Sequence, residues 1–371
     1  MAENSTSGLT IDEVSVGAWK VPTDLPESDG TLEWDSTTII IVECRAGDTT
    51  GIGYSYTHAA AAQLIDDELA DAIEGQDPLN VNRCWIEMVK SIRNLGRAGI
   101  SSSAIAAVDV ALWDLKGKLL GLPVYRLIGA VREEVPVYGS GGFTSYDDGE
   151  LCAQLSSWIE EGIEMVKMKV GREPDRDVDR VAIARDAIGD DPDLFVDANG
   201  AYDRKEALTL AEEFAKHGVS WFEEPVSSND LEGLRLLRDR APVSMDVTSG
   251  EYAYDLARFR EMLLAGAVDV MQPDATRCAG ITGFMAAAEL CRAFEIPVSA
   301  HTAPSIHMHL GCSTLNFRHL EYFHDHVRIE KMFFDGFRSQ ADGVMKPDHD
   351  RPGLGIDFQR SDAEPYRTAI G

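Results

Sequence analysis

The segment that determines the fold spans residues 165–200 and reads MVKMKVGREPDRDVDRVAIARDAIGDDPDLFVDANG. It begins with a short apolar run, continues with a stretch of helical length, and ends with a second apolar run. A strand, a helix and a second strand in this order indicate a βαβ unit, in which the two strands are parallel. The same alternation recurs from about Val135 to Glu321.

Eight strands are predicted in this region, at VPVYG, MVKMKV, DLFVDAN, VSWFEE, VSMDVTSG, VDVMQPD, IPVSAH and RHLEY. Helices fit between them, for example DRKEALTLAEEFAKHG and GITGFMAAAELCRAFE. Eight strands that alternate with helices over about 190 residues predict a parallel sheet closed into a barrel. The expected fold class is therefore α/β, with a (β/α) barrel over residues 131–325.

The segments on either side of the barrel have a different pattern. Residues 1–130 begin with alternating β-like stretches and continue with helical ones, which predicts a small α+β domain. Within it, residues 20–34 are rich in proline, glycine and acids, a composition typical of a mobile loop. Residues 326–371 are less regular, and we expect this C-terminal segment to return to the small domain.

Composition excludes several classes of function. The formal net charge is −29, which argues against nucleic acid as a partner, because phosphate binding needs a basic surface. The six cysteines are scattered without a C-x-x-C motif, and we expect reduced thiols in a cytoplasmic protein. No apolar stretch has the length of a signal peptide core or a membrane span.

Ionisable side chains follow the predicted strands at one end of the barrel. The active site of such a barrel lies at the C-terminal ends of its strands. From the second strand to the eighth, these ends carry Lys167 and Lys169, Asp197 with Asn199, Glu223, Glu251, Asp274, His301 and Glu321. The two lysines are two residues apart, so both can point into the barrel mouth. Surface solvation alone does not explain so ordered a ring.

Three members of the ring are carboxylates on adjacent strands, namely Asp197, Glu223 and Glu251. Converging carboxylates repel one another, and a hard divalent cation such as Mg²⁺ relieves that repulsion. Glu224 and Asp246 are nearby acids that compete with Glu251 for this role. A cation flanked by potential bases suits removal of a proton next to a carboxylate, since it stabilises the enediolate that forms.

The chain resembles the enolase superfamily, and within it the mandelate racemase subgroup. The resemblance covers nearly the whole chain, and the matching pieces are VKMKVG, FVDANG, WFEEP, SGE, QPDATRCAG, SAHTAP and SSSAIAAVDVALWDLKGKLLGLPVYRLIG. It implies a modified TIM barrel with an N-terminal capping domain, whose early loop at about residues 20–34 closes over the substrate.

The resemblance also implies a role for each residue of the ring. Asp197, Glu223 and Glu251 would bind Mg²⁺. Lys169 would act as the base on one face of the substrate, and His301, paired with Asp274, would act on the other. The remaining contacts would be to the substrate, from Lys167 against its carboxylate, Asn199 nearby, and Glu321 at a carboxylate oxygen.

The predicted reaction is dehydration of an acid sugar, in which His301 as an acid helps a β-hydroxyl group leave. Racemisation or epimerisation of a hydroxy acid and lactone cycloisomerisation use the same constellation, and the sequence does not separate them. The segment at residues 20–34 contains several acids and no arginine, which favours a substrate with one carboxylate. Arg277, three residues after Asp274, could supply a cation at the rim. We expect a homo-oligomer.

Two other hypotheses remain open at this point. Lys167 or Lys169 could act as the nucleophile of a Schiff-base aldolase. The barrel could instead be a binding protein that has lost catalysis, but the intact ring argues against this. His307 and His309 are expected to pack or to support the site. The run His324, Asp325 and His326 looks like a metal cluster, but it follows the last strand, and we predict no metal role for it.

Overall fold

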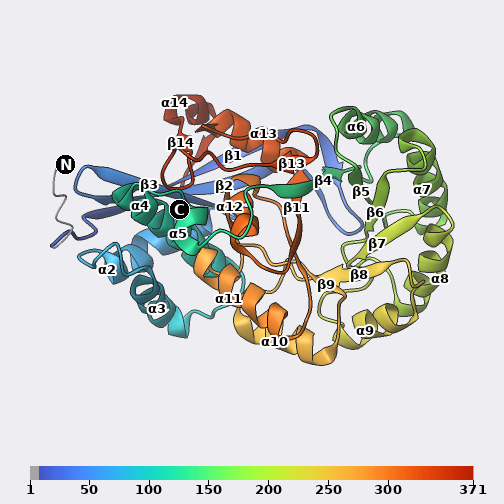
Figure 1. Ribbon diagram of the computed structural model, residues 1–371, viewed down its shortest axis with the longest axis horizontal. Helices are drawn as coiled ribbons and strands as arrows, with labels where there is room; N and C mark the ends of the chain where they lie inside the picture. The colour runs from blue at the N-terminus through green and yellow to red at the C-terminus, as the bar shows by residue number, and fades with distance from the viewer. Residues whose placement is uncertain (1–7, 371) are drawn as a thin grey trace.

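The computed structural model describes residues 8–370 and places a small sheet with its helices beside a larger barrel (Figure 1). The strands of the small sheet are hydrogen-bonded in the order β15-β1-β2-β3, all antiparallel. Their bounds are β1 Glu13–Ser28, β2 Glu33–Ala46, β3 Thr49–Tyr56 and β15 Arg367–Thr368. Because β15 pairs with β1, the last residues of the chain lie on this capping sheet.

Helices cover one face of the capping sheet. They are α1 Ala60–Leu64, η1 Ile65–Leu69, α2 Ala70–Ile73, α3 Val81–Ser91, η2 Ile92–Asn94, α4 Ile100–Leu120 and α5 Val124–Ile128. The long helix α4 approaches β3 so closely that Gly51 and Gly53 leave no room for a side chain. A Cβ atom at Gly53 would lie 2.2 Å from the carbonyl oxygen of Ala107, and one at Gly51 would lie 2.3 Å from that of Ala111.

The eight predicted barrel strands are all present and form a closed, parallel sheet. They are β4 Val135–Gly141, β5 Met165–Lys169, β6 Asp193–Asp197, β7 Val219–Glu223, β8 Asp246–Ser249, β9 Val270–Met271, β10 Val298–Ala300 and β11 Phe317–Phe323. Each pairs with the next, and β11 pairs with β4 to close the barrel. The short β13 Val344–Met345 adds an antiparallel strand beside β4.

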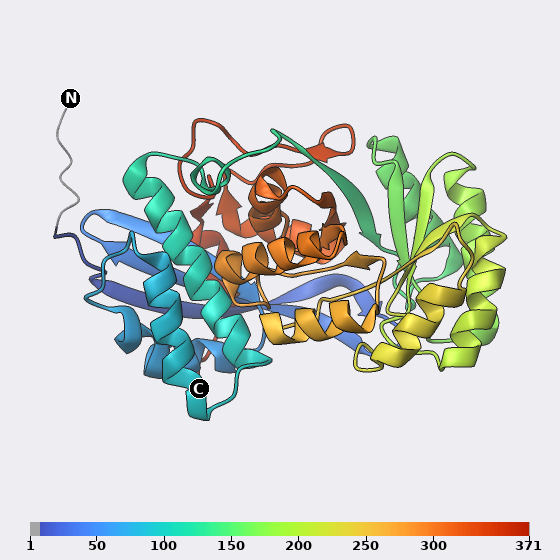
Figure 2. The same cartoon turned by 60° about the horizontal axis from the view of Figure 1, so that its bottom comes forward.

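Helices form the outer layer of the barrel (Figures 1 and 2). They are α6 Asp148–Glu160, α7 Pro174–Ile188, α8 Arg204–Ala215, α9 Leu231–Arg240, α10 Leu256–Ala265, α11 Gly280–Ala293 and α12 Pro304–Ser313. After the last strand follow α13 His324–Phe333, β12 Phe334–Asp335, β14 Asp357–Phe358, α14 Arg360–Ala363 and η3 Glu364–Tyr366. The strands that precede these helices are short and parallel, so the last side chain of each strand lies at the same rim of the barrel.

The segment at residues 20–34 differs from its prediction, because it is a β-hairpin and not an irregular loop. β1 continues to Ser28 and β2 begins at Glu33, with a register shift between Pro22 and Glu27. The proline-rich composition indicated a loop, but proline is tolerated where a strand has an irregularity. The hairpin reaches from the capping sheet to the barrel, as the blue strands in both views show (Figures 1 and 2).

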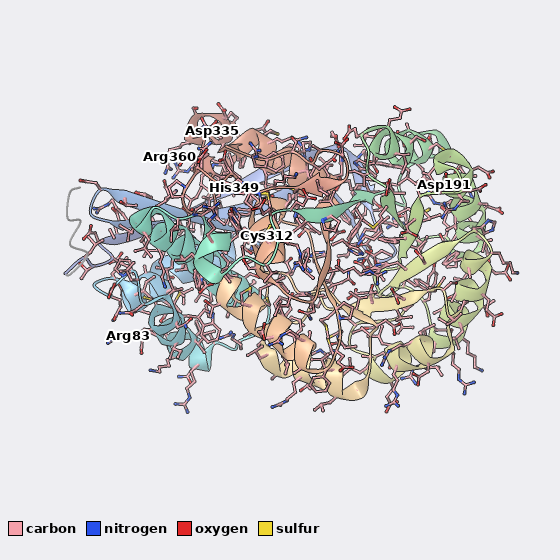
Figure 3. All side chains as sticks on the ribbon, viewed as in Figure 1. Arg83, Asp191, Cys312, Asp335, His349 and Arg360 are labelled. Carbon is pink, nitrogen blue, oxygen red and sulfur yellow. The ribbon has the colours of Figure 1, made fainter. Side chains whose placement is uncertain are left out.

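Most of the barrel interior is filled by side chains. Tyr138, Phe195, Trp221 and Val270 form a separate buried cluster inside the barrel, and the ring of His319 contacts it. The six cysteines are unpaired thiols, and Cys312 lies within the body of the molecule (Figure 3). Among residues 8–370, no helix combines the length and the apolar character needed to cross a membrane.

Candidate active site

A cavity of about 410 Å³ lies between the barrel mouth and the capping domain. Six of the predicted site residues line it: Lys169, Asn199, Glu251, Arg277, His301 and Glu321. Four others, Lys167, Asp197, Glu223 and Asp274, are buried directly behind these residues at the same strand ends. The structure therefore brings all ten predicted residues to one end of the barrel.

The three carboxylates expected to bind a cation converge. Asp197, Glu223 and Glu251 each offer one oxygen, and these atoms all lie within 4.8 Å of one another. Oε1 of Glu223 and Oδ1 of Asn199 are buried without a hydrogen-bond partner. Burial, followed by the negative charge of Asp197, raises the pKa of Glu223 to about 7. Crowded carboxylates with unpartnered buried oxygens fit a hard divalent cation.

The two lysines of β5 differ in their surroundings. Nζ of Lys167 is fully buried, 2.7 Å from Oε2 of Glu223 and 2.8 Å from Oε1 of Glu321. Lys167 therefore holds two carboxylates of the site and has no exposed surface. Nζ of Lys169 lies at the edge of the cavity, 2.5 Å from Oδ2 of Asp197.

His301 is oriented by a carboxylate, as predicted. Its Nδ1 lies 2.8 Å from Oδ2 of Asp274, and its Nε2 is 3.3 Å from Oε2 of Glu251. Burial disfavours the charged ring, but Glu251 and Glu321 outweigh it and raise the pKa of His301 to about 10. Nε2 of His301 is thus directed toward the carboxylate cluster.

Asp274 is itself held in place from both sides. Its Oδ1 accepts hydrogen bonds from the backbone N–H and the hydroxyl of Thr276. Next to it, Nε2 of His307 accepts the backbone N–H of Ala275, and Nδ1 of His307 donates to the carbonyl of Thr302. His307 thus links the ends of β9 and β10, which fits the supporting role expected for it.

Glu321 and Arg277 complete the rim. Oε1 of Glu321 accepts the hydroxyl of Ser140, and its Oε2 accepts the backbone N–H of Thr302. Burial opposes ionisation of Glu321, yet Lys167 and His301 lower its pKa to about 2. Nη1 of Arg277 lies 2.9 Å from Oε1 of Glu251, so this guanidinium is already paired.

Neither competing acid belongs to the converging group of Asp197, Glu223 and Glu251. Asp246 stands at the opposite end of β8, ion-paired with Arg318. Glu224 is buried, and its Oε1 accepts the hydroxyl of Ser249. Glu251 is therefore the better candidate.

The resemblance implied that the segment at about residues 20–34 covers the substrate, but sequence reasoning missed the rest of the capping-domain wall of the cavity. That wall consists of Asp29, Leu32, Trp34, Ser36, Thr37, Thr38, Tyr56, Thr57 and His58. The ring of Tyr56 stacks on His326 at 3.3 Å between centroids. These residues carry no motif, and only the packing of the hairpin against the barrel brings them to the site.

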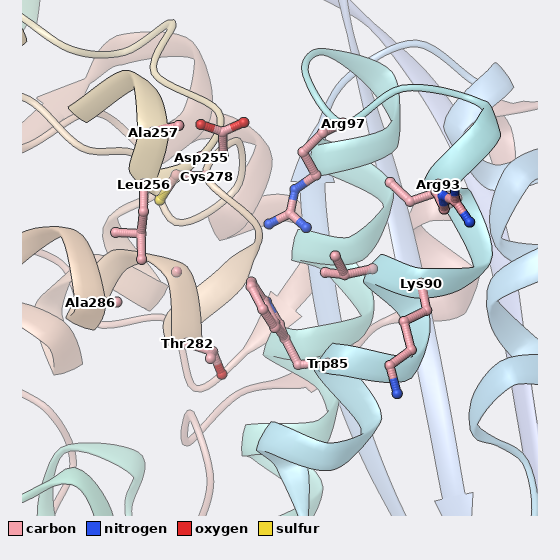
Figure 4. Close-up of a pocket in the computed structure, with 13 residues that line it drawn as sticks. Trp85, Lys90, Arg93, Arg97, Asp255, Leu256, Ala257, Cys278, Thr282 and Ala286 are labelled. Carbon is pink, nitrogen blue, oxygen red and sulfur yellow. The ribbon is translucent and has the colours of Figure 1, made fainter. Parts of the chain in front are cut away.

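A second cavity, of about 910 Å³, lies between α3 and the helices α10 and α11 (Figure 4). Trp85, Arg97 and Leu256 are among its lining residues, and the Arg97 guanidinium points into it (Figure 4). None of the ten predicted site residues lines this cavity. Although it is larger, it lacks the convergent ionisable groups of a catalytic site.

Two family patterns match the chain. Residues 13–129 match the mandelate racemase / muconate lactonizing enzyme N-terminal domain, and residues 150–363 match the enolase C-terminal domain-like family. Among curated proteins, L-talarate/galactarate dehydratase of Salmonella typhimurium is 33% identical, over 86% of this chain and 80% of its own length. The 3,6-anhydro-alpha-L-galactonate cycloisomerase of Streptomyces coelicolor is 31% identical, over 94% and 98% respectively.

Solved structures agree with this placement. A mandelate racemase/muconate lactonizing enzyme-like protein from Rubrobacter xylanophilus superposes with a TM-score of 0.95 at 49% identity, covering 97% of this chain and all of that one. A racemase from Streptomyces coelicolor with bound magnesium has a TM-score of 0.91 at 29% identity, covering 96% of this chain and all of that one.

Proposed function

The chain belongs to the mandelate racemase/muconate lactonizing enzyme family of the enolase superfamily, and on that premise we propose that it dehydrates an acid sugar by α-proton removal. One observation carries the proposal. Lys169 contacts Asp197, and His301 contacts Glu251, so the carboxylate cluster lies between two potential bases. A substrate held at the cluster would meet one base on each side.

We assign the cation site to Mg²⁺, held by Asp197, Glu223 and Glu251. Their oxygen-only donor set suits this ion, and the magnesium-bound structure of the Streptomyces coelicolor racemase supports the choice. When bound, Mg²⁺ would stabilise the negative charge that develops on the substrate carboxylate as the α-proton leaves. Lys167 would act here by fixing the orientation of Glu223 and Glu321.

Lys169 and His301 would each carry out one step of the elimination. Lys169 takes the α-proton, and the electrons of the C–H bond form the enediolate. His301, charged and held by Asp274, gives a proton to the β-hydroxyl group as the C–O bond breaks and water leaves. The resulting enol tautomerises to a 2-keto acid. Glu321 would lie beside a carboxylate oxygen of the substrate, and Asn199 would bind a hydroxyl group.

The proposed substrate carries a single carboxylate. The capping-domain wall offers neutral hydroxyl groups from Ser36, Thr37 and Thr57. The lysine and arginine side chains that line the cavity are Lys169 and Arg277, and both contact carboxylates of the cluster. Among the described lining residues, no Lys or Arg without a carboxylate partner lies at the far end of the cavity, where it could bind a second carboxylate of the substrate. This composition suits the polyol chain of a monocarboxylic sugar acid.

Dehydration can be tested directly. Sugar acids with one and with two carboxylates are incubated with the enzyme and Mg²⁺, and the 2-keto acid product is trapped with semicarbazide. We expect product from a monocarboxylic acid. In deuterated solvent, His301→Asn should keep α-proton exchange but lose elimination, and Lys169→Ala should lose both. Full turnover by both variants on the true substrate would contradict the mechanism.

The alternative is racemisation, epimerisation or cycloisomerisation at the same site. It is favoured by the same two-sided placement of Lys169 and His301, and by the likeness to the Streptomyces coelicolor cycloisomerase. In that case no keto acid forms. Each single variant would then exchange the α-proton of only one configuration.

We also infer a homo-oligomer. Leu256, which lines the cavity of Figure 4, is 42% exposed, and Leu95 and Ile100, close in sequence to the lining residue Arg97, are 58% and 43% exposed. A second copy that covers these side chains would remove apolar surface from water. Light scattering measures the assembly, and a monomer at all concentrations would contradict the inference.

A further inference from the structure

A second group of potential metal ligands lies where the hairpin meets the start of α13. Asp24 and Glu27 come from β1, and His324 is the first residue of α13. One ligand atom of each residue lies within 4.8 Å of the others. His324 is about 300 positions away from Asp24 and Glu27, so the sequence alone does not group the three.

Glu27 is the residue of this group that has an oxygen without a binding partner. It is completely buried, and its Oε2 accepts a hydrogen bond from the indole N–H of Trp34 at 2.7 Å. Its Oε1 is buried without any hydrogen-bond partner. A buried carboxylate oxygen without a hydrogen-bond partner reduces the stability of the folded protein, so a group that binds this oxygen would be stabilised there.

The surroundings are short of positive charge. The carboxylates of Asp325 and Asp24 lie near that of Glu27. Oδ2 of Asp325 is likewise buried and unpartnered. Arg328 is the nearby cation, and its guanidinium is occupied by Oδ1 of Asp325 and the carbonyl of Pro22. Three carboxylates therefore face one imidazole and one guanidinium.

We propose that Asp24, Glu27 and His324 form a second cation site, distinct from the catalytic one, for a divalent first-row transition metal ion such as Zn²⁺. A set of one imidazole nitrogen and two carboxylate oxygens suits these ions better than Mg²⁺, which prefers oxygen alone. With bonds of about 2.2 Å, two ligands of one ion lie up to about 4.4 Å apart. A small rotation of the exposed Asp24 closes the observed spacing.

The ion would fasten the hairpin to the barrel. His324 Nε2 already lies 3.0 Å from Oδ2 of Asp24, and binding would replace this pairing with two bonds to one ion. Glu27 holds the indole of Trp34, which lines the active-site cavity. A bound ion therefore fixes one wall of that cavity without touching the substrate.

The site is tested by counting metal. The protein and its variants are dialysed against Zn²⁺ with and without a large excess of Mg²⁺, and zinc is measured by mass spectrometry. We expect one zinc per chain that Mg²⁺ does not displace, and at least about tenfold weaker binding of it in His324→Gln and in Asp24→Asn. His217→Gln, on the outer side of the barrel, is the matched control and should bind zinc as the wild type does.

The Glu223→Ala background separates this site from the catalytic one, because it removes a catalytic ligand only. There, added Zn²⁺ should slow amide hydrogen exchange of residues 22–34, and His324→Gln should abolish the slowing. Wild-type zinc binding by both His324→Gln and Asp24→Asn would overturn the site. Zinc binding without any change in hydrogen exchange would overturn its role in fastening the hairpin.

Discussion

Replacing Gly30 by alanine should lift the hairpin off the barrel. Gly30 lies at the tip, between β1 and β2, against the C-terminal ends of β5 and β6. A Cβ atom there would lie 2.5 Å from the carbonyl oxygen of Ala198 and 2.8 Å from that of Val170. Both contacts are with backbone and cannot be relieved by a side-chain rotation, so the tip must move away.

The size of the effect follows from the contacts that the tip would lose. Thr144 donates from its N–H to the carbonyl of Ser28 at 2.9 Å and from its hydroxyl to that of Asp29 at 2.8 Å. The hydroxyl of Ser145 donates to the carbonyl of Pro26 at 2.6 Å. Three such hydrogen bonds contribute about 3 kcal/mol together. The docked population should therefore fall by about a hundredfold if docking is only marginally favourable.

The assay combines kinetics with hydrogen exchange. We expect Gly30→Ala to lower kcat/KM by up to about a hundredfold, with faster exchange confined to residues 22–34 and an unchanged melting temperature of the barrel. Thr31→Ala is the control, because it alters the neighbouring tip residue without adding an atom against the barrel. Wild-type kcat/KM and wild-type protection of the hairpin in Gly30→Ala would refute the reasoning.

Three further predictions concern the site and its support. Glu223→Ala should weaken Mg²⁺ binding at least about tenfold in calorimetry, and unchanged binding would exclude Glu223 as a ligand. Asp274→Asn should slow the step served by His301 by about a hundredfold or more in kinetic measurements, because the ring loses its orientation and its charge partner. His309 is buried with its pKa lowered to about 4 by burial, so stability should be lost as pH falls from about 6.5 to about 4, by up to about 3 kcal/mol. Denaturant unfolding at several pH values should show a weaker loss in His309→Gln.

The barrel and its ring of ionisable residues could be predicted because both depend on local patterns. Alternation of strand and helix identifies a parallel barrel, and every strand end then points to the same rim. The i, i+2 spacing of Lys167 and Lys169 predicts that both face inward, and both are buried at the strand ends. No long-range information was needed for these conclusions.

The strand pairing of the hairpin and the cavity-lining residues outside it could not be predicted, since tertiary contacts determine them. Composition indicated a loop at residues 20–34, but pairing of β1 with β2 overrides local preference. The turn is closed by Asp29, whose Oδ1 accepts the N–H groups of Thr31 and Leu32. Trp34 and Tyr56 reach the cavity only because this hairpin and β3 lie against the barrel.

Two opposing influences act on the pKa of Lys169. Burial and the nearby positive charge of Lys167 lower it, but the carboxylate of Asp197, 2.5 Å away, outweighs both effects, and the pKa of Lys169 is raised. The sequence did not indicate that the lysine and a predicted metal ligand would contact each other.

A cation on the cluster should lower the pKa of both Lys169 and His301. Lys169 owes its raised pKa to Asp197, and His301 owes part of its own to Glu251. At 4 Å and an effective dielectric of about 20, one unit charge contributes about 4 kcal/mol, or about three pKa units. A divalent ion shared by these carboxylates cancels their pull on each base. Metal removal should therefore stop α-proton exchange and elimination together, whereas His301→Asn should stop elimination alone. Exchange of either configuration that persists in fully metal-depleted enzyme would disprove this coupling.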